Sequence, residues 1–239
     1  LVPTSGCGPV DNYEVLPDLP QGVHLDAVTG GLSGAPDEES PATLYEIEAS
    51  NDQGHSVVLI LITVLPVPPC DLQYPVGDLI LTVGEEMTPL LPTSGCGPVE
   101  SYTILPPLPQ GVSLDSSSGI ISGTPQVTND RFDHVILAGN VSGTTSFLIN
   151  VTVVPLAPCD LFYPLDSLIL EPGEDIGFLE PSIGCGAPEF WQVTPALPDG
   201  MSLDSSSGII SGAPSGIQDL QTHLISAINS SGSSNFELD

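Results

Sequence analysis

The phrase "TSGCGPV" occupies residues 4–10 and returns letter for letter at residues 93–99. A looser copy, "SIGCGAP", follows at residues 182–188. All five cysteines share one spacing of 89 residues, within the two sets Cys7, Cys96, Cys185 and Cys70, Cys159. A fixed period of this size predicts tandem copies of a single folding unit.

Other phrases keep the same spacing. The stretch "LPDLPQGVHLDAVTGGLSGAP" at residues 16–36 becomes "LPPLPQGVSLDSSSGIISGTP" at 105–125 and "TPALPDGMSLDSSSGIISGAP" at 194–214, without insertion or deletion. Each copy is large enough to bury a core of its own. We therefore expect three domains, at residues 1–67, 68–156 and 157–239.

The composition and local patterns favour strands. The chain contains 26 prolines and 25 glycines in 239 residues, and no window combines a helical period with caps. "VSLDSSSGIISG" is typical of a short hairpin around a Ser/Gly turn, and residues 134–154 predict a longer hairpin. About seven short strands in each period is the count of an immunoglobulin-like sandwich. The expected fold class is all-β.

The repeated string also resembles a known family. The pattern "LPxGhxLDxxxGxhSGxP", followed by an "A-x-N-xx-G" hairpin, is similar to the immunoglobulin-like and dystroglycan-type cadherin-like tandem repeats of extracellular surface proteins. The resemblance covers the whole chain three times over. It implies β-sandwiches used as spacers or adhesion modules and implies no catalytic site. The chain lacks the acidic calcium motifs of the better-known cadherins.

In such a sandwich the second strand returns to the end where the first strand begins. Cys70 and Cys159 stand where a repeat begins, and Cys96 and Cys185 lie in the returning loop. We expect the disulfides Cys70–Cys96 and Cys159–Cys185, each closing 26 residues. The rival pair Cys96–Cys159 would join opposite ends of one sandwich, beyond the limit of about 7 Å between Cα atoms. The paired spacings favour an oxidising, extracellular location.

Cys7 is expected to have no partner within these residues. Leu1 aligns with Leu90, so the first copy lacks the opening part of the unit. Asp239 aligns with Asn150, so the third copy stops inside its last strand. One interpretation is a window cut from a longer array. The alternative is that another chain supplies the missing strands in trans.

The charge restricts the possible partners. Thirty acidic residues face a single cation, Arg131, for a formal charge of −29. Nucleic acids and anionic membranes are repelled by such a surface. No DxDxDG loop, CxxC pair or histidine at ligand spacing occurs, so we expect no metal site and no cofactor. The longest apolar run, residues 57–65, is too short to span a membrane.

Candidate catalytic residues are few, and we expect no enzyme activity. Asp26, Asp115 and Asp204 recur in the "LD" before each hairpin turn, where an aspartate typically makes a turn hydrogen bond. His134 and His223 share the repeat position of Tyr45, which favours a structural strand position over a catalytic one.

Three sequons predict N-linked sugar, at Asn140, Asn150 and Asn229. In "FLINVTV" the alternation turns Phe147, Ile149, Val151 and Val153 toward the core and Asn150 outward. The first repeat has no sequon in the matching turn, because the sequence there is Asn51-Asp-Gln.

The first repeat differs on the matching strand. At the 89-residue spacing, the four core-facing residues of the second repeat correspond to Val58, Ile60, Ile62 and Val64, which we expect to face the core of the first repeat. Val57, Leu59 and Leu61 then form an outward apolar stripe, which is a liability on a monomer. We expect this stripe to contact a neighbouring subunit.

Two functions remain. The first is a structural protein that polymerises with copies of itself into a glycosylated extracellular fibre, appendage or sheath. The second is the spacer stalk of a cell-surface adhesin that binds carbohydrate or protein elsewhere.

Overall fold

The computed structural model describes residues 8–239, and Cys7 therefore lies outside the described part of the chain. The described residues form strands and turns and contain no helix. Two compact units are distinguished, one of Leu1–Gln73, Pro92–Tyr102 and Leu137–Ser146, the other of Tyr74–Leu91, Thr103–Ile136 and Phe147–Asp239. The strands themselves follow the 89-residue period, so the elements are given repeat by repeat.

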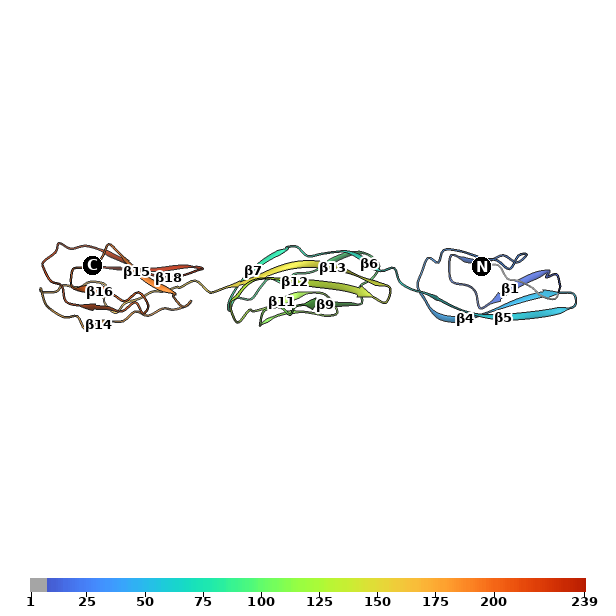
Figure 1. Ribbon diagram of the computed structural model, residues 1–239, viewed down its shortest axis with the longest axis horizontal. Helices are drawn as coiled ribbons and strands as arrows, with labels where there is room; N and C mark the ends of the chain where they lie inside the picture. The colour runs from blue at the N-terminus through green and yellow to red at the C-terminus, as the bar shows by residue number, and fades with distance from the viewer. Residues whose placement is uncertain (1–7) are drawn as a thin grey trace. The chain divides into compact units, whose positions relative to one another are not determined.

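The second repeat has the fullest set of strands (Figure 1). They are β6 (Pro69–Gln73), β7 (Asp78–Thr82), β8 (Thr93–Cys96), β9 (Ser101–Leu105), β10 (Val112–Leu114), β11 (Ile121–Gly123), β12 (Asn129–Asn140) and β13 (Gly143–Val154). One sheet has the order β7-β13-β12-β9, β10 pairs with β11, and β6 pairs with β8. β7 runs parallel to the end of β13, whereas the hairpins are antiparallel. This all-β arrangement of a four-stranded sheet with shorter antiparallel pairs is the expected immunoglobulin-like sandwich.

The first and third repeats contain fewer strands, most of them at the same 89-residue phase as strands of the second repeat. The first contains β1 (Asn12–Leu16), β2 (Val23–Leu25), β3 (Leu32–Gly34), β4 (Ser40–Asn51) and β5 (Gly54–Val64). The third contains β14 (Phe178–Leu179), β15 (Phe190–Thr194), β16 (Met201–Leu203), β17 (Ile210–Gly212), β18 (His223–Asn229) and β19 (Gly232–Leu238). β1-β4-β5 and β15-β18-β19 each repeat the β9-β12-β13 part of the second repeat.

The alternation of side chains along β13 is confirmed. Ile149, Val151 and Val153 are 0%, 0% and 2% exposed, so this face is fully buried. Leu238, the counterpart of Ile149 in the third repeat, is also buried. The core of that repeat further contains Tyr163, Trp191 and Ile225. Period-2 burial of this kind fixes the register, because a slip of one residue would expose every core residue of the strand.

One expected core position is wrong. Val58 was expected to face the core, but its side chain is 53% exposed. Its counterpart Phe147 is covered by Tyr74, whose ring centroid lies 5.4 Å away. No described residue of the first repeat takes the place of Tyr74. Val58 therefore lies on the expected face of its strand but remains exposed to solvent.

The turn after each "LD" is held by a glycine. Gly208 has φ of +74°, and a Cβ atom added there would lie 2.5 Å from Cδ2 of Trp191. The indole ring therefore packs directly on the glycine backbone. Gly177 offers a matched comparison, because its φ is +68° but nothing lies within 4 Å of an added Cβ.

We predict that Gly208→Ala destabilises the third repeat more than Gly177→Ala. Both variants force an L-residue into the left-handed region, which costs roughly 1–2 kcal/mol. Gly208→Ala also overpacks the indole, which adds about 1–3 kcal/mol. Trp191 is the only tryptophan, so denaturant unfolding followed by its fluorescence reports on this repeat. Equal losses in the two variants would show that the indole contact contributes nothing.

Candidate functional site

The opening segments of the second and third repeats are tied to the rest of their sandwiches. Cys70 pairs with Cys96, and Cys159 pairs with Cys185, with Cα separations of 5.4 Å and 5.1 Å. This is the pairing expected from the sequence. A 26-residue disulfide loop stabilises a fold by about 3 kcal/mol in the chain-entropy account.

A tyrosine four residues after Cys70, and another four residues after Cys159, makes a second tie. Tyr74 donates a hydrogen bond of 2.6 Å from its hydroxyl to the carbonyl oxygen of Gly119. Tyr163 makes the equivalent bond to Gly208. Burial raises the pKa of Tyr163 above its ordinary value, so this hydroxyl stays protonated and keeps donating. The tyrosine thus joins the opening segment to the glycine turn.

An asparagine makes the third tie, at the turn of the long hairpin. The Nδ2 atom of Asn140 donates to the carbonyl oxygens of Val67 and Pro98, at 2.8 Å and 3.0 Å. Its Oδ1 atom accepts from the backbone N–H groups of Ser142 and Gly143. One amide therefore joins the hairpin turn, the returning loop and the segment that precedes the repeat.

The third repeat repeats this arrangement in a buried setting. Asn229 is 5% exposed, and its Nδ2 atom donates to Leu156 and Ala187 at 2.7 Å and 3.2 Å. In the first repeat, Asn51 donates to the carbonyl oxygen of Pro9 at 2.7 Å. The recurring asparagine thus has a structural role, which its sequon alone did not indicate.

This use of the asparagine bears on two of the expected modification sites, Asn140 and Asn229. Both Nδ2 hydrogens of Asn140 and of Asn229 are donated to backbone carbonyl groups. A glycan would replace one of those hydrogens, and the lost bond would leave a carbonyl without its partner. Asn150 is different, because its Nδ2 atom makes one bond, to Asp78 at 3.1 Å, from an outward position on β13.

We predict that, in a host that glycosylates sequons, Asn150 carries sugar and Asn140 and Asn229 do not. Peptide mapping by mass spectrometry after enzymatic deglycosylation in heavy-oxygen water measures each site separately. Asn150→Gln should then abolish the mass shift of the whole chain. Full occupancy at Asn229 would contradict the hydrogen bonding described above.

The recurrent aspartates lie in exposed turns. Oδ1 of Asp204 accepts from the hydroxyl of Ser206 and from the backbone of Ser206 and Ser207. Asp115 has the same partners in Ser117 and Ser118, and Asp26 bonds the backbone of Val28 and Thr29. The expectation of a turn hydrogen bond is confirmed.

The histidines of the long hairpins are structural as well. His134 and His223 are 2% and 6% exposed, and Tyr45 at the same phase is 4% exposed. Nδ1 of each histidine bonds a proline carbonyl, of Pro106 at 2.9 Å and of Pro195 at 3.0 Å. The remaining two, His24 and His55, lie on β2 and β5 of the first repeat. Within residues 8–239 no group of three His, Cys, Asp or Glu side chains gathers to hold a metal ion.

The aspartate turn predicts a defined pH dependence. The side-chain hydrogen bond from Ser206, then the backbone bond from Ser207, hold the pKa of the Asp204 carboxyl far below its ordinary value of 3.8. Because the folded pKa is the lower one, the ionised turn stabilises the fold fully above about pH 4 and loses that contribution as the pH falls toward the folded pKa.

We predict that Asp204→Asn removes this part of the acid sensitivity. Asparagine keeps an oxygen acceptor but does not titrate, so the thermal midpoint reported by Trp191 should fall less between pH 4 and pH 2 than in the parent chain. Asp115→Asn is the control, since it alters the same turn in the repeat without tryptophan. An unchanged pH profile in Asp204→Asn would contradict the assignment.

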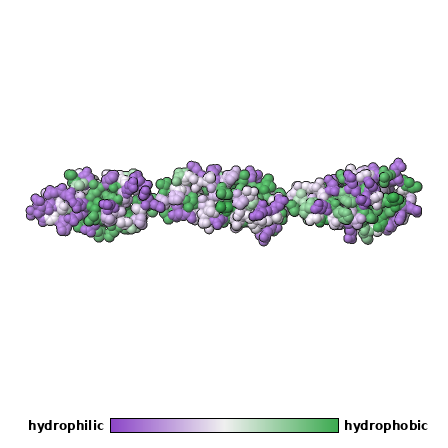
Figure 2. Space-filling model, turned by 180° about the vertical axis from the view of Figure 1, so that it is seen from behind, coloured by the Kyte–Doolittle hydropathy of each residue, from purple (hydrophilic) through white to green (hydrophobic). Residues whose placement is uncertain are grey.

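Apolar surface is present on the first repeat. Val57, Leu59 and Leu61 on β5 are 43%, 56% and 66% exposed. Leu61 lies opposite Leu44, itself 55% exposed, while Leu59 and Val57 lie opposite Glu46 and Glu48. Figure 2 shows apolar and polar side chains side by side on the molecular surface. The expected apolar stripe is therefore outward-facing, with a carboxylate row along one side.

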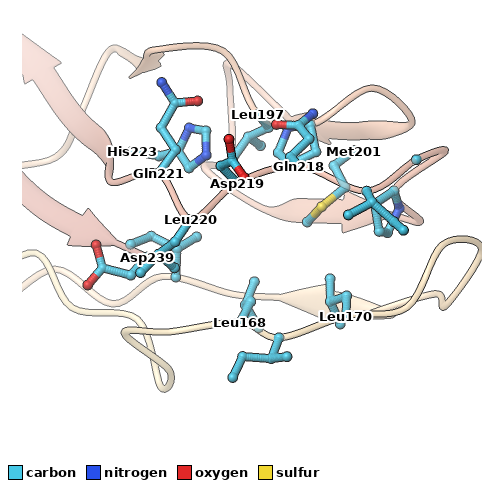
Figure 3. Close-up of a pocket in the computed structure, with 16 residues that line it drawn as sticks. Leu168, Leu170, Leu197, Met201, Gln218, Asp219, Leu220, Gln221, His223 and Asp239 are labelled. Atoms are coloured by element: carbon cyan, nitrogen blue, oxygen red, sulfur yellow. The ribbon is translucent and has the colours of Figure 1, made fainter.

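The third repeat contains a groove of about 290 Å³. Leu168 and Leu170 lie on one wall, and Gln218, Leu220 and Gln221 lie across from them (Figure 3). Leu197, Met201 and His223 also line the groove. No residue of this groove was singled out from the sequence as a ligand site.

The fold and the ties place the chain in the class of immunoglobulin-like repeat proteins. Its repeats are built of β-sheets with alternating buried side chains, and a disulfide closes the second and the third repeat. The chain belongs to the family described as "Putative Ig domain", whose sequence profile matches residues 71–154 and 186–238, more than half of the chain. The dystroglycan-type, cadherin-like part of the resemblance is not confirmed by this match.

Curated relatives include the "Serine-rich adhesin for platelets" of Staphylococcus aureus strain USA300, which is 28% identical over 173 residues. The match covers 67% of this chain and 7% of that adhesin. The same adhesin of strain MRSA252 is also 28% identical, with 12% of its length covered. The chain thus spans a small part of the length of these relatives.

Solved structures with a similar arrangement include an I-band fragment of titin and the insect immune protein hemolin. The titin fragment is 14% identical, with a TM-score of 0.45, and the match covers 95% of this chain and 87% of the fragment. Hemolin is 18% identical, with a TM-score of 0.44, and the match covers 82% and 55%.

No helix among the described residues is long and apolar enough to cross a membrane.

Proposed function

We propose that this chain is a structural segment of an extracellular repeat protein, in which head-to-tail sandwiches build the rod of a fibre, surface appendage or sheath. The observation that carries the proposal is the repetition of one sandwich, whose second and third copies are tied in the same way. In the second and third repeats, a disulfide, a tyrosine hydroxyl and an asparagine amide hold the opening segment. Such ties suit a segment that transmits load along the chain.

The role is non-catalytic in this proposal. The recurrent aspartates are occupied by turn hydrogen bonds, and His134 and His223 bond backbone carbonyls from buried positions. These side chains recur at fixed phase and are of types that can carry acid–base chemistry. Their partners are backbone and serine groups, which supports a purely structural use.

A second candidate is the stalk of a surface adhesin. It is favoured by the similarity to the staphylococcal adhesin, of which this chain spans a small part. A stalk would separate a binding tip from the surface without binding a ligand itself. Both candidates place the chain outside the cell, where the two disulfides persist.

Electron microscopy of the native material separates these functions. The rod of a fibre should appear as regular filaments built of this repeat. Isolated stalks that lack filaments, on a parent protein that captures a glycan or receptor, would reject the fibre and support the adhesin.

We further propose that copies of the chain associate through the Val57, Leu59 and Leu61 face. Burying apolar surface contributes about 25 cal/mol per Å², part of which is lost to the cost of association. The first repeat has no sequon at its hairpin turn, so no N-glycan from that turn would cover this face. A contact between unlike surfaces propagates into a filament instead of closing.

We predict that Leu59→Asp with Leu61→Asp prevents filament formation, because two charges would then be buried at the contact. Sedimentation and electron microscopy of the assembling protein measure the effect. Leu148→Asp is the matched control, on the same face of the second repeat at 53% exposure, and should leave filaments unchanged. Circular dichroism checks that each variant folds. Filaments that form normally in the double variant would exclude this face.

A further inference from the structure

An aspartate follows the first cysteine of each disulfide. The chain reads Cys-Asp-Leu at residues 70–72 and again at residues 159–161. Both aspartates have a positive φ, of 49° for Asp71 and 50° for Asp160. Few side chains adopt this left-handed region, and aspartate and asparagine are among those that tolerate it best. The backbone therefore takes the same uncommon turn beside both disulfides.

This turn brings the carboxylate back to the sulfur of the preceding cysteine. β6 pairs with β8 at Cys70 and again at Gln73, and the register shifts between these two residues, where Asp71 lies. Interruptions of this kind re-aim side chains. Oδ2 of Asp71 lies 3.3 Å from Sγ of Cys70. In the third repeat, Oδ2 of Asp160 lies 3.4 Å from Sγ of Cys159.

The returning loop leaves room for this contact. A glycine precedes the second cysteine of each disulfide, at residues 95 and 184. A Cβ atom added to Gly184 would lie 2.8 Å from Oδ2 of Asp160. One added to Gly95 would lie 3.2 Å from Sγ of Cys70. Glycine, aspartate and the two cysteines therefore form one recurring group, in which a carboxylate lies against a disulfide.

The disulfide of the second repeat can be reached by thiols from solvent, because Cys96 is exposed and Cys70 is only partly buried. An attacking thiolate binds one sulfur and expels the other as a thiolate. Attack on Cys70 brings negative charge to the sulfur that Asp71 contacts. Attack on Cys96 instead releases negative charge on Cys70, beside the same carboxylate. Since like charges a few ångströms apart repel, one aspartate opposes exchange in both directions.

We propose that Asp71 and Asp160 protect the two disulfides kinetically, by repelling the thiolates that would exchange with them. In that exchange one S–S bond forms to the external thiolate and one breaks, and the expelled cysteine carries away the negative charge. The formal charge of −29 repels anionic thiols at longer range, and the two aspartates add a repulsion at the sulfur itself. The role concerns the ties within each sandwich and does not depend on a fibre.

The test is reduction of the folded 239-residue chain by glutathione, with the fifth cysteine replaced as Cys7→Ser so that it cannot exchange. Alkylation at timed intervals and peptide mass spectrometry measure the rate at each disulfide. We expect Asp71→Asn to accelerate reduction of Cys70–Cys96 about threefold to tenfold, the effect of a single charge a few ångströms away in water. Asparagine tolerates the left-handed region, so the backbone is retained. Circular dichroism checks that the variant folds.

Asp130→Asn is the matched control. It removes the same charge from the start of β12, whereas Asn140, which bonds the returning loop, lies at the end of that strand. Reduction of Cys70–Cys96 should proceed at the parent rate in this variant. Asp160→Asn should accelerate reduction of Cys159–Cys185 alone, and Trp191 fluorescence checks that the third repeat stays folded.

The charge of the thiol separates repulsion from a loosened fold. The acceleration in Asp71→Asn should be smaller with cysteamine, whose ammonium group is attracted to a carboxylate. It should also be smaller with glutathione in about 1 M salt, where charges are screened within ~3 Å. An unchanged rate in Asp71→Asn or an equal acceleration in Asp130→Asn would overturn the proposal. An acceleration that neither the thiol's charge nor salt alters would overturn it as well.

Discussion

Attachment of the opening segment to the rest of the sandwich is the constraint on which the second and third repeats depend. A β-sandwich of about 89 residues has a small core, and its opening segment contributes to that core, since Leu72 and Tyr74 are 1% and 6% exposed. Here the segment is fixed at three points by different chemistry. The disulfide constrains the unfolded chain, the hydroxyl of Tyr74 bonds a buried backbone carbonyl group, and the amide of Asn140 bonds two further backbone carbonyl groups.

These ties also explain why certain residues recur at fixed phase. The glycine of each "LD" turn needs a left-handed backbone, and in the third repeat it also provides the flat surface on which Trp191 packs. The same glycine's carbonyl group accepts the tyrosine hydroxyl. The aspartate fixes the start of the turn through backbone bonds. Turn, aromatic core and opening segment are therefore one connected unit, and a change in one member acts on the other two.

The three repeats show how strongly a strand depends on its neighbours. Phe147 packs on Tyr74, but its counterpart Val58 is more than half exposed. Leu81 is buried beside Val153, but its counterpart Leu170 is only partly covered. The sequences at these positions have similar patterns. Their burial differs because a strand becomes a core element only when a neighbouring strand covers it.

Much of this fold could be predicted from the sequence because its signals are periodic or local. The cysteine spacing, the alternation around Ile149 and the Asp115 turn each involve a repeated or short pattern. The role of Asn140 could not be predicted in this way. Its bonding partners lie 73 and 42 residues away, whereas the sequon that drew attention to it spans three residues. The same two separations recur for Asn229, so the signal exists only at the level of the repeat.

The negative charge determines the conditions under which apolar surface can remain exposed. A formal charge of −29 on 239 residues makes the copies repel one another. The one ion pair found in the described part of the chain, Arg131–Asp78 at 2.7 Å, lies between two exposed side chains and contributes little to stability. Most carboxylates therefore act collectively, over a range of about 10 Å at 0.1 M salt. Repulsion over this range opposes random contact between apolar faces. An ordered contact between copies has to offset the same repulsion by burying apolar surface. Because the buried area is small, the two surfaces must be complementary in shape.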